Sequence, residues 1–251
     1  MRQRLTIQRT GKPLNPGAIL LFCLPPAGAG ASVFYPLLAL DSPSVNICPI
    51  AIPGREGRIQ EPLPSSIQAL AKQIASELEA NTRQPFALLG YSMGALVGYE
   101  LIHHWNASRV PAPLHFFPLA ARPPHVPFQQ GLHDAPNPEF RSRLSALGGM
   151  HSEILQNGEL MEIYEPLLRN DFRNCDEYLQ PVPLPIPCPV DAYISDQDPL
   201  VTLTDARSWE DCTQLPFRLN PLQGESHILS QKALLTVAKH VLNRLRAKTA
   251  S

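Results

Sequence analysis

One serine lies in a pattern typical of a nucleophile. Ser92 is the central residue of the pentapeptide GYSMG at positions 90–94. An apolar run at 86–90 precedes it, and apolar residues at helical spacing follow it from Met93. A GxSxG serine becomes a nucleophile when it lies on a sharp turn between a strand and a helix, because that turn exposes its hydroxyl. The context therefore predicts a nucleophilic Ser92 rather than a serine in an ordinary turn.

A serine hydroxyl attacks a carbonyl poorly unless a base removes its proton and an acid holds the base in the correct tautomer. The best candidate for the base is His227, in the polar segment GESH (224–227) between the last predicted strand and the final predicted helix. Two carboxylates follow the preceding strand, Asp196 and Asp198. The turn signal Asp198-Pro199 favours Asp198 as the acid, and the residues alone leave Asp196 open.

The oxyanion that forms during such an attack needs N–H donors. We expect one donor from Met93, which follows the nucleophile, and one from the loop PPAGAG (25–30) after the first predicted strand. Proline has no N–H, so Ala27 is the first donor in this loop. The glycines of the loop also suggest dinucleotide binding, but Val33 occupies the place of the third glycine in that fingerprint, which makes this interpretation the weaker one.

The elements that must position these residues alternate along the chain. Continuous apolar runs are typical of strands covered on both faces. We expect strands at 18–24, 45–52, 86–90, 114–120, 190–195 and 217–221, and helices at 32–40, 66–80, 93–105, 205–212 and 229–246. This alternation predicts an α/β fold with a mostly parallel central sheet and helices on both faces.

Residues 123–189 break the alternation. They contain no strand pattern but helical patterns at 138–147, 152–156 and 159–179, the last interrupted at Pro166. Such an insert predicts a mobile helical lid over the carboxyl edge of the sheet, within a single domain that spans 1–251. Its exit, 181–189, has prolines at alternate positions. We interpret this run as a stiff extended connection rather than as a ligand for a proline-binding domain.

Composition argues against several classes of function. The 21 Lys and Arg residues are balanced by 22 Asp and Glu, which leaves no basic excess for nucleic acid. No apolar run approaches the ~20 residues of a membrane span. The five cysteines are scattered and include no CxxC pair, so they indicate neither a disulfide framework nor a zinc site. We expect a monomeric enzyme of the reducing cytoplasm that needs no metal and no bound cofactor.

With these residues in place, the chain resembles the stand-alone type II thioesterases of polyketide synthase and nonribosomal peptide synthetase pathways, which are α/β hydrolases with a helical lid. The resemblance extends from about residue 21 to 229 and rests on LFCLPPAG (21–28), PGREGR (53–58), GYSMGA (90–95), LHD (132–134), the segment 144–149, RNDF (169–172), DPLV (198–201) and GESH (224–227). It implies Ser92 as nucleophile, Asp198 as acid and His227 as base, with Met93 and Ala27 as oxyanion donors.

Two positions depart from the family pattern. Tyr91 stands where such enzymes often have histidine, and Glu225-Ser226 replaces the glycine expected before the catalytic histidine. Neither departure removes a reacting group.

The resemblance implies hydrolysis of stalled or aberrant acyl groups from the phosphopantetheine arm of acyl or peptidyl carrier proteins, on assembly lines for antibiotics or siderophores. Phosphopantetheine then belongs to the substrate. No carrier-domain sequence precedes the first predicted strand, which favours a stand-alone enzyme. Candidate contacts to an acidic carrier are Arg141, Arg143, Arg169 and Arg173.

Two other functions compete with this one. The first is a carboxylesterase or lipase that acts on small oxygen esters. The second is a non-catalytic scaffold, which usually lacks a triad residue, whereas none is lacking here.

Overall fold

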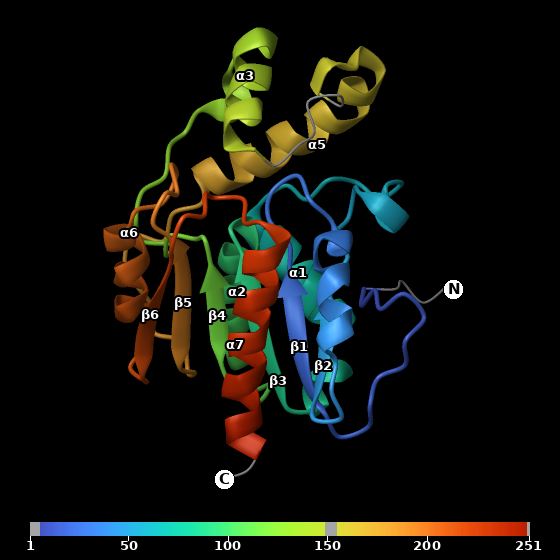
Figure 1. Ribbon diagram of the computed structural model, residues 1–251, viewed down its shortest axis with the longest axis vertical. Coiled ribbons are helices and arrows are strands. Elements are labelled where there is room, and N and C mark those ends of the chain that lie inside the picture. The colour runs from blue at the N-terminus through green and yellow to red at the C-terminus, as the bar shows by residue number, and fades with distance from the viewer. Residues whose placement is uncertain (1–5, 149–154, 250–251) are drawn as a thin grey trace.

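Six strands form one parallel sheet in the order β2-β1-β3-β4-β5-β6 (Figure 1). The computed structural model describes residues 6–148 and 155–249. The strands are β1 (Ile19–Leu24), β2 (Val45–Pro49), β3 (Phe86–Tyr91), β4 (Phe116–Leu119), β5 (Val190–Ser195) and β6 (Phe217–Leu222). The order reverses between β1 and β3, and in parallel sheets ligands bind at the carboxyl ends of the strands beside such a reversal.

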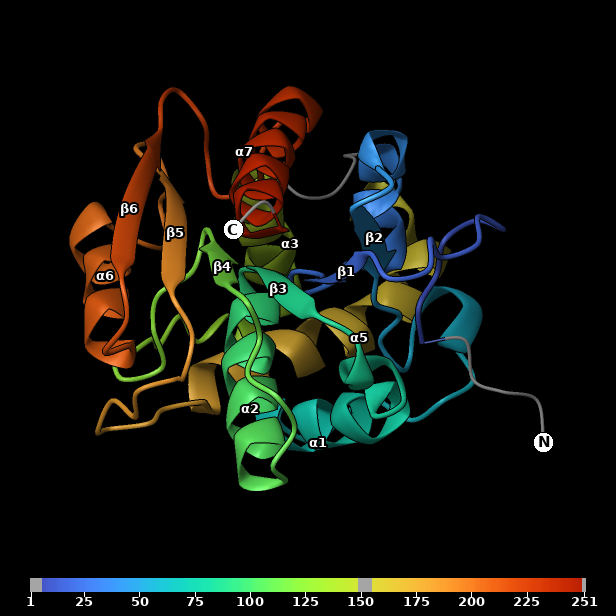
Figure 2. The same cartoon turned by 90° about the horizontal axis from the view of Figure 1, so that it is seen from below.

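Helices cover both faces of this sheet. One face carries η1 (Ala31–Leu40) and α7 (Gln231–Thr249), and the other carries α1 (Ile67–Leu78) and α2 (Met93–Ala107). Figure 2 shows the sheet between α7 on one side and α1 and α2 on the other. The remaining short elements outside the insertion are η2 (Glu56–Arg58), η3 (Asn81–Arg83), α6 (Leu203–Arg207) and η5 (Ser208–Cys212). The prediction of an α/β fold with a mostly parallel sheet is confirmed.

Strands β1 to β5 are buried on both sides, which explains their continuous apolar sequences, whereas β6 at the edge of the sheet is partly exposed. In β1, Leu20, Phe22 and Leu24 pack toward α1 and α2, while alternate residues pack toward η1 and α7. Every residue of β1 and β3 is buried. Two predicted helices differ in detail: 32–40 is a 3₁₀ helix, and the segment at 205–212 changes from α to 3₁₀ geometry at Ser208.

The segment between β4 and β5 contains η4 (Leu132–Asp134), α3 (Asn137–Leu147) and α5 (Gly158–Glu177). Helices α3 and α5 lie over the carboxyl ends of the strands (Figure 1). We call residues 123–189 the insertion. The helix expected at 152–156 lies mostly outside the described residues. Gly148 ends α3 in a left-handed conformation, with φ of 76°, as glycine does at many helix ends.

The expected interruption at Pro166 is wrong, because α5 continues through this residue. A proline inside a helix removes one backbone hydrogen bond. Met161 and Leu168 are buried on either side of it and join the same apolar cluster as α3. These packing contacts offset the missing bond and keep both halves of the helix aligned.

The proline-rich exit of the insertion is held against the body of the protein. The Tyr99 hydroxyl donates to the carbonyl of Leu184 at 2.8 Å and accepts from its N–H at 3.1 Å. Ile186 forms an isolated parallel bridge with Thr213. This segment therefore serves as the return connection to β5.

Candidate active site

Ser92 occupies a strained turn between β3 and α2. Its φ is 51° and its ψ is −114°, a conformation that residues with a side chain rarely adopt. The two flanking glycines of GYSMG are needed for close packing. A Cβ atom at Gly94 would collide with the carbonyl oxygen of Leu24 in β1, and one at Gly90 would collide with the backbone of Ala95. The turn thus places the serine at the carboxyl edge of the sheet.

A continuous hydrogen-bonded series connects three of the predicted site residues. Ser92 Oγ lies 2.9 Å from His227 Nε2, and His227 Nδ1 lies 2.8 Å from Asp198 Oδ2. The side chain of Asp198 is fully buried and that of His227 is 7% exposed. Oδ1 of Asp198 accepts the N–H groups of Leu200 and Val201 at 2.8 and 3.0 Å. These bonds fix the carboxylate, which in turn can fix the imidazole.

The two candidate acids lie in different environments. Asp196 is exposed, and its Oδ1 accepts the N–H of Gly224 at 2.8 Å. It therefore stabilises the turn after β6, while Asp198 holds His227. The sequence could not separate these carboxylates because both follow β5 within three residues.

Tyr91, a departure from the family pattern, supports the histidine loop. Its buried hydroxyl donates to the carbonyl of His227 at 3.0 Å and accepts the N–H of Leu229 at 2.7 Å. Burial raises the pKa of this phenol, so it remains a neutral donor. The other departure, Glu225, accepts the N–H and hydroxyl of Ser230 at 2.9 Å each. In the sequence, these supporting roles are indicated only by the two departures themselves: Tyr91 in place of histidine and Glu225-Ser226 in place of glycine.

The loop after β1 lines the same cavity as Ser92, and its N–H groups differ in their partners. The N–H of Gly28 donates to Asp171 at 2.8 Å, and that of Ala29 donates to the carbonyl of Pro26 at 3.2 Å. Among the described residues, no acceptor bonds the N–H of Ala27. Met93 is the first residue of α2, and N–H groups of a first helical turn have no partner within the helix.

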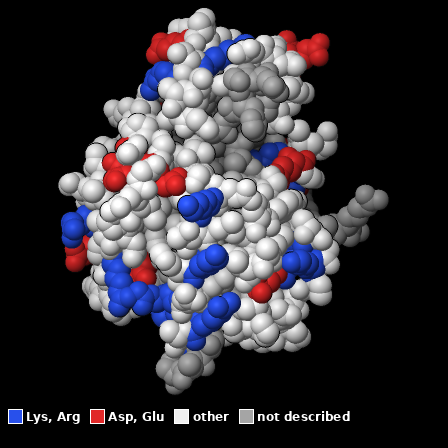
Figure 3. Space-filling model, in the orientation of Figure 1, with Lys and Arg blue, Asp and Glu red and all other residues white. Residues whose placement is uncertain are grey.

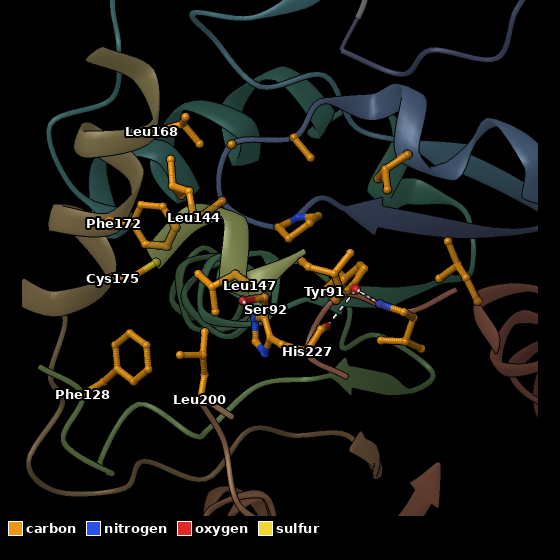
Figure 4. Close-up of a pocket in the computed structure, with 18 residues that line it drawn as sticks. Tyr91, Ser92, Phe128, Leu144, Leu147, Leu168, Phe172, Cys175, Leu200 and His227 are labelled. Carbon is orange, nitrogen blue, oxygen red and sulfur yellow. Dashed lines mark hydrogen bonds between the residues drawn. The ribbon is translucent and has the colours of Figure 1, made fainter. Parts of the chain in front are cut away.

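An apolar cavity of about 170 Å³ opens above the serine (Figure 4). Ser92 and His227 lie at its floor, and side chains of the insertion lie opposite them, as Figure 4 shows. A second cavity of about 190 Å³ adjoins it. The two cavities share the apolar residues Phe128, Leu147, Phe172 and Leu200.

Residues 6–148 and 155–249 lack two features, a cluster of metal ligands and a membrane-spanning helix. No group of three or more His, Cys, Asp or Glu side chains in these ranges is arranged to hold a metal ion. Within the same ranges, no helix combines the length and the apolar content needed to cross a bilayer.

The parallel sheet, the strained serine turn after β3 and the histidine loop after β6 define an α/β hydrolase. The chain belongs to the thioesterase family, because the family model described as "Thioesterase domain" matches residues 20–247.

Relatives and solved structures agree with this assignment. The chain is 33% identical to the gramicidin S biosynthesis protein GrsT of Aneurinibacillus migulanus, over 83% of this chain and 82% of the relative. It is similar to the type II thioesterase BorB from the borrelidin biosynthetic cluster, with a TM-score of 0.86, 28% identity and 98% and 99% of the two chains covered. ClbQ from the colibactin NRPS/PKS pathway has a TM-score of 0.84 and 26% identity, over 92% of this chain and 99% of ClbQ.

Proposed function

We propose that this chain is a stand-alone serine thioesterase that removes stalled or aberrant acyl groups from the phosphopantetheine arm of carrier proteins. The observation that carries this proposal is the series from Ser92 through His227 to Asp198 at the floor of an apolar cavity. The thioesterase family match and the similarity to proteins of peptide and polyketide pathways support the substrate class. All five cysteines are buried free thiols, which suits a reducing cytoplasm.

In the first half of the proposed reaction, Ser92 Oγ attacks the thioester carbonyl while His227 Nε2 accepts the hydroxyl proton. Asp198 holds the imidazole by its other nitrogen and stabilises the imidazolium without taking the proton. The N–H groups of Ala27 and Met93 donate to the oxyanion. The carbon–sulfur bond then breaks, and His227 returns the proton to the leaving thiolate, which gives a free thiol and an acyl-serine.

In the second half, water attacks the acyl-serine while His227 accepts a proton from it. The ester bond breaks, the proton passes to Ser92 Oγ, and the free acid leaves. Atoms and charges balance with water as the only co-reactant, so these steps call for no metal and no bound cofactor.

The cavities suggest where each part of the substrate binds. The apolar cavity at Ser92 and the one that adjoins it suit an acyl chain. A third, more open cavity of about 610 Å³ shares Gly28, Ala29 and Val33 with the first and also carries polar side chains such as Glu56. We place the polar pantetheine arm there, because its amides need partners or water that an apolar wall lacks.

The distribution of charged side chains does not identify the surface that contacts the carrier protein. On the face in Figure 3, basic side chains gather over α7, whereas the insertion carries both signs. Arg169 is engaged inside the insertion, where it donates to the carbonyls of His133 and Ala135 and stacks on Phe140. Arg173 donates to Asn170 at 2.7 Å. Arg143 likewise donates to the carbonyl of Gln130 at 2.7 Å, and Arg141 makes a longer bond, at 3.5 Å, to the carbonyl of Leu155. These bonds do not rank the four arginines, and we keep Arg141 and Arg143, which share α3, as the pair to test for carrier contacts.

Hydrolysis of a panel of acyl-carrier proteins tests the function, with Ser92→Ala as the inactive control. The same acyl group presented as a thioester and as an oxygen ester separates a thioesterase from a carboxylesterase. We expect faster hydrolysis of the thioester at equal concentration. A clear preference for the oxygen ester, or turnover retained by Ser92→Ala, would contradict the proposal.

A further inference from the structure

A carboxylate of the insertion reaches the loop that carries Ala27. Asp171, on α5, is 1% exposed. Its Oδ2 accepts the N–H of Gly28 at 2.8 Å. The helix that covers the site thus makes a direct hydrogen bond to the peptide group that follows Ala27.

Arg55, from the loop after β2, completes this arrangement. Its Nη1 lies 2.7 Å from Asp171 Oδ2, and its Nη2 lies 3.0 Å from Oδ1. Nη1 also donates to the carbonyl of Ala29 at 3.1 Å. Both side chains of the ion pair are nearly inaccessible, at 4% and 2% exposure. The pair therefore holds the loop after β1 at two backbone groups. Asp171 binds the N–H of Gly28, and Arg55 binds the carbonyl of Ala29.

Contact between the loop and α5 is close. Gly28 has φ of 76°, and a Cβ atom there would collide with Cδ2 of Leu168. The N–H of Gly28 is bonded to Asp171, and the carbonyl of Ala29 is bonded to Arg55. The N–H of Ala27 has no acceptor among the described residues. The arrangement thus immobilises Gly28 and Ala29, the two residues that follow Ala27 in the loop.

We infer that Asp171 and Arg55 are positioning residues for the oxyanion hole, so that α5 of the insertion must be seated on the body before the site is complete. The inference rests on the proposed function. An oxyanion donor stabilises the transition state only when it already points to where the charge develops, and a misplacement of about 1 Å can cost on the order of 100-fold in rate. Neither side chain needs to touch the substrate.

The test replaces both charges together, as Arg55→Met with Asp171→Leu. Removal of one partner leaves an unpaired buried charge and unfolds many proteins, whereas apolar replacement of the whole pair is often tolerated. The matched control is Arg9→Met with Asp41→Leu. Arg9 and Asp41 form a similar pair at 2.8 Å that binds the backbone of Ile47 in β2.

We expect the Arg55/Asp171 double variant to lose about 100-fold in kcat on both a small acyl-thiol and an acyl-carrier protein, with little change in KM. Ser92 should react with a fluorophosphonate more slowly by a similar factor, and the melting temperature should match that of the control variant. The control should keep wild-type kcat. Wild-type kcat in the Arg55/Asp171 variant, or a defect confined to KM, would overturn the inference.

A conservative variant keeps the test decisive if the double variant does not fold. Arg55→Lys keeps the charge opposite Asp171 but offers one nitrogen in place of the two that bind Asp171 and the carbonyl of Ala29, so its kcat should fall between those of the wild type and the double variant. An unchanged kcat together with a lowered melting temperature would show a purely structural role and overturn the inference. Failure of the wild type to be labelled at Ser92 would instead contradict the proposed function itself.

Discussion

The sheet edge and the insertion hold their functional side chains by different means. At the edge, Ser92 directly follows β3, Asp198 follows β5, and His227 follows β6. In the insertion, Asp171 lies within α5 and binds Arg55, 116 residues earlier in the chain. The edge is positioned by strand ends, which are local features of the sequence. The insertion is positioned by long-range bonds from side chains, which become visible only in the folded chain.

The base and the tip of the insertion also differ. Arg122, buried at the base, donates to the carbonyls of Pro123 and Cys175, and thereby joins the entry of the insertion to the last turns of α5. Burial lowers its pKa to about 10, so it remains charged at neutral pH. At the tip, α3 and α5 share a small apolar cluster of their own, which includes Phe140 and Leu144. The base therefore helps to attach the insertion, together with the Arg55–Asp171 pair, whereas the tip is shaped by its own packing.

The largest expected effect is at the sheet edge. Ser92→Ala should abolish covalent labelling by a fluorophosphonate and lower kcat by on the order of 10⁴-fold or more, because the nucleophile is gone. Intact-protein mass spectrometry should show one added group on the wild type and none on the variant. His227→Ala should be comparably severe, while His125→Ala, outside the hydrogen-bonded series, should be mild. Labelling that persists without Ser92 would place the nucleophile elsewhere.

The two aspartates after β5 give the next largest contrast. Asp198→Asn should lower kcat by about 10⁴-fold, because the amide favours the wrong histidine tautomer. Asp196→Asn should change kcat by less than about tenfold, since this residue bonds only a turn. Steady-state kinetics on one acyl-thiol measures both variants. Equal effects would remove the distinction between the two carboxylates.

At the base of the insertion, Arg122→Met should lower the free energy of unfolding by at least about 2 kcal/mol, because several buried carbonyls lose a charged donor. Urea unfolding measures this loss, and limited proteolysis should cut the insertion faster. Arg83→Met, at an exposed position, is the control. An unchanged unfolding curve would show that the base is held by other contacts.

Tyr91→Phe should lower kcat by about tenfold, because the histidine loop loses a donor and a buried N–H loses its acceptor. The expected change is in kcat rather than KM. Tyr193→Phe is the control, since this buried tyrosine makes no hydrogen bond through its hydroxyl to the described residues. The same kcat in the two variants would mean that Tyr91 does not brace His227.

The smallest effect concerns carrier contacts. Arg141→Glu with Arg143→Glu should lower kcat/KM for an acetyl-carrier protein by about three- to tenfold and leave an acetyl-thiol of low mass unaffected. The control reverses the charge of two exposed lysines of α7, as Lys232→Glu with Lys239→Glu. An equal change on both substrates, or none on either, would discard these arginines as contacts.

The sequence by itself determined the sheet, its helices and the strained turn at Ser92. Buried strands need continuous apolar runs, and the turn needs glycine at positions 90 and 94, where a Cβ atom would collide with neighbouring backbone. The apolar runs and the contact of Gly90 with Ala95 are local, whereas Gly94 meets Leu24 of β1; all of them are nevertheless visible in the order of residue types, because the two glycines recur in the GxSxG pattern. The resemblance to known thioesterases added the preference for Asp198.

Only the tertiary structure decided which groups meet. The bond from Tyr91 to His227 spans 136 positions, and the bond from Gly28 to Asp171 spans 143. The continuity of α5 through Pro166 likewise depends on apolar contacts with another helix. The physical reason is the same in each case, because a hydrogen bond or a packing contact depends on distance in space. The order of residue types along the chain does not show which distant segments the folded sheet brings together.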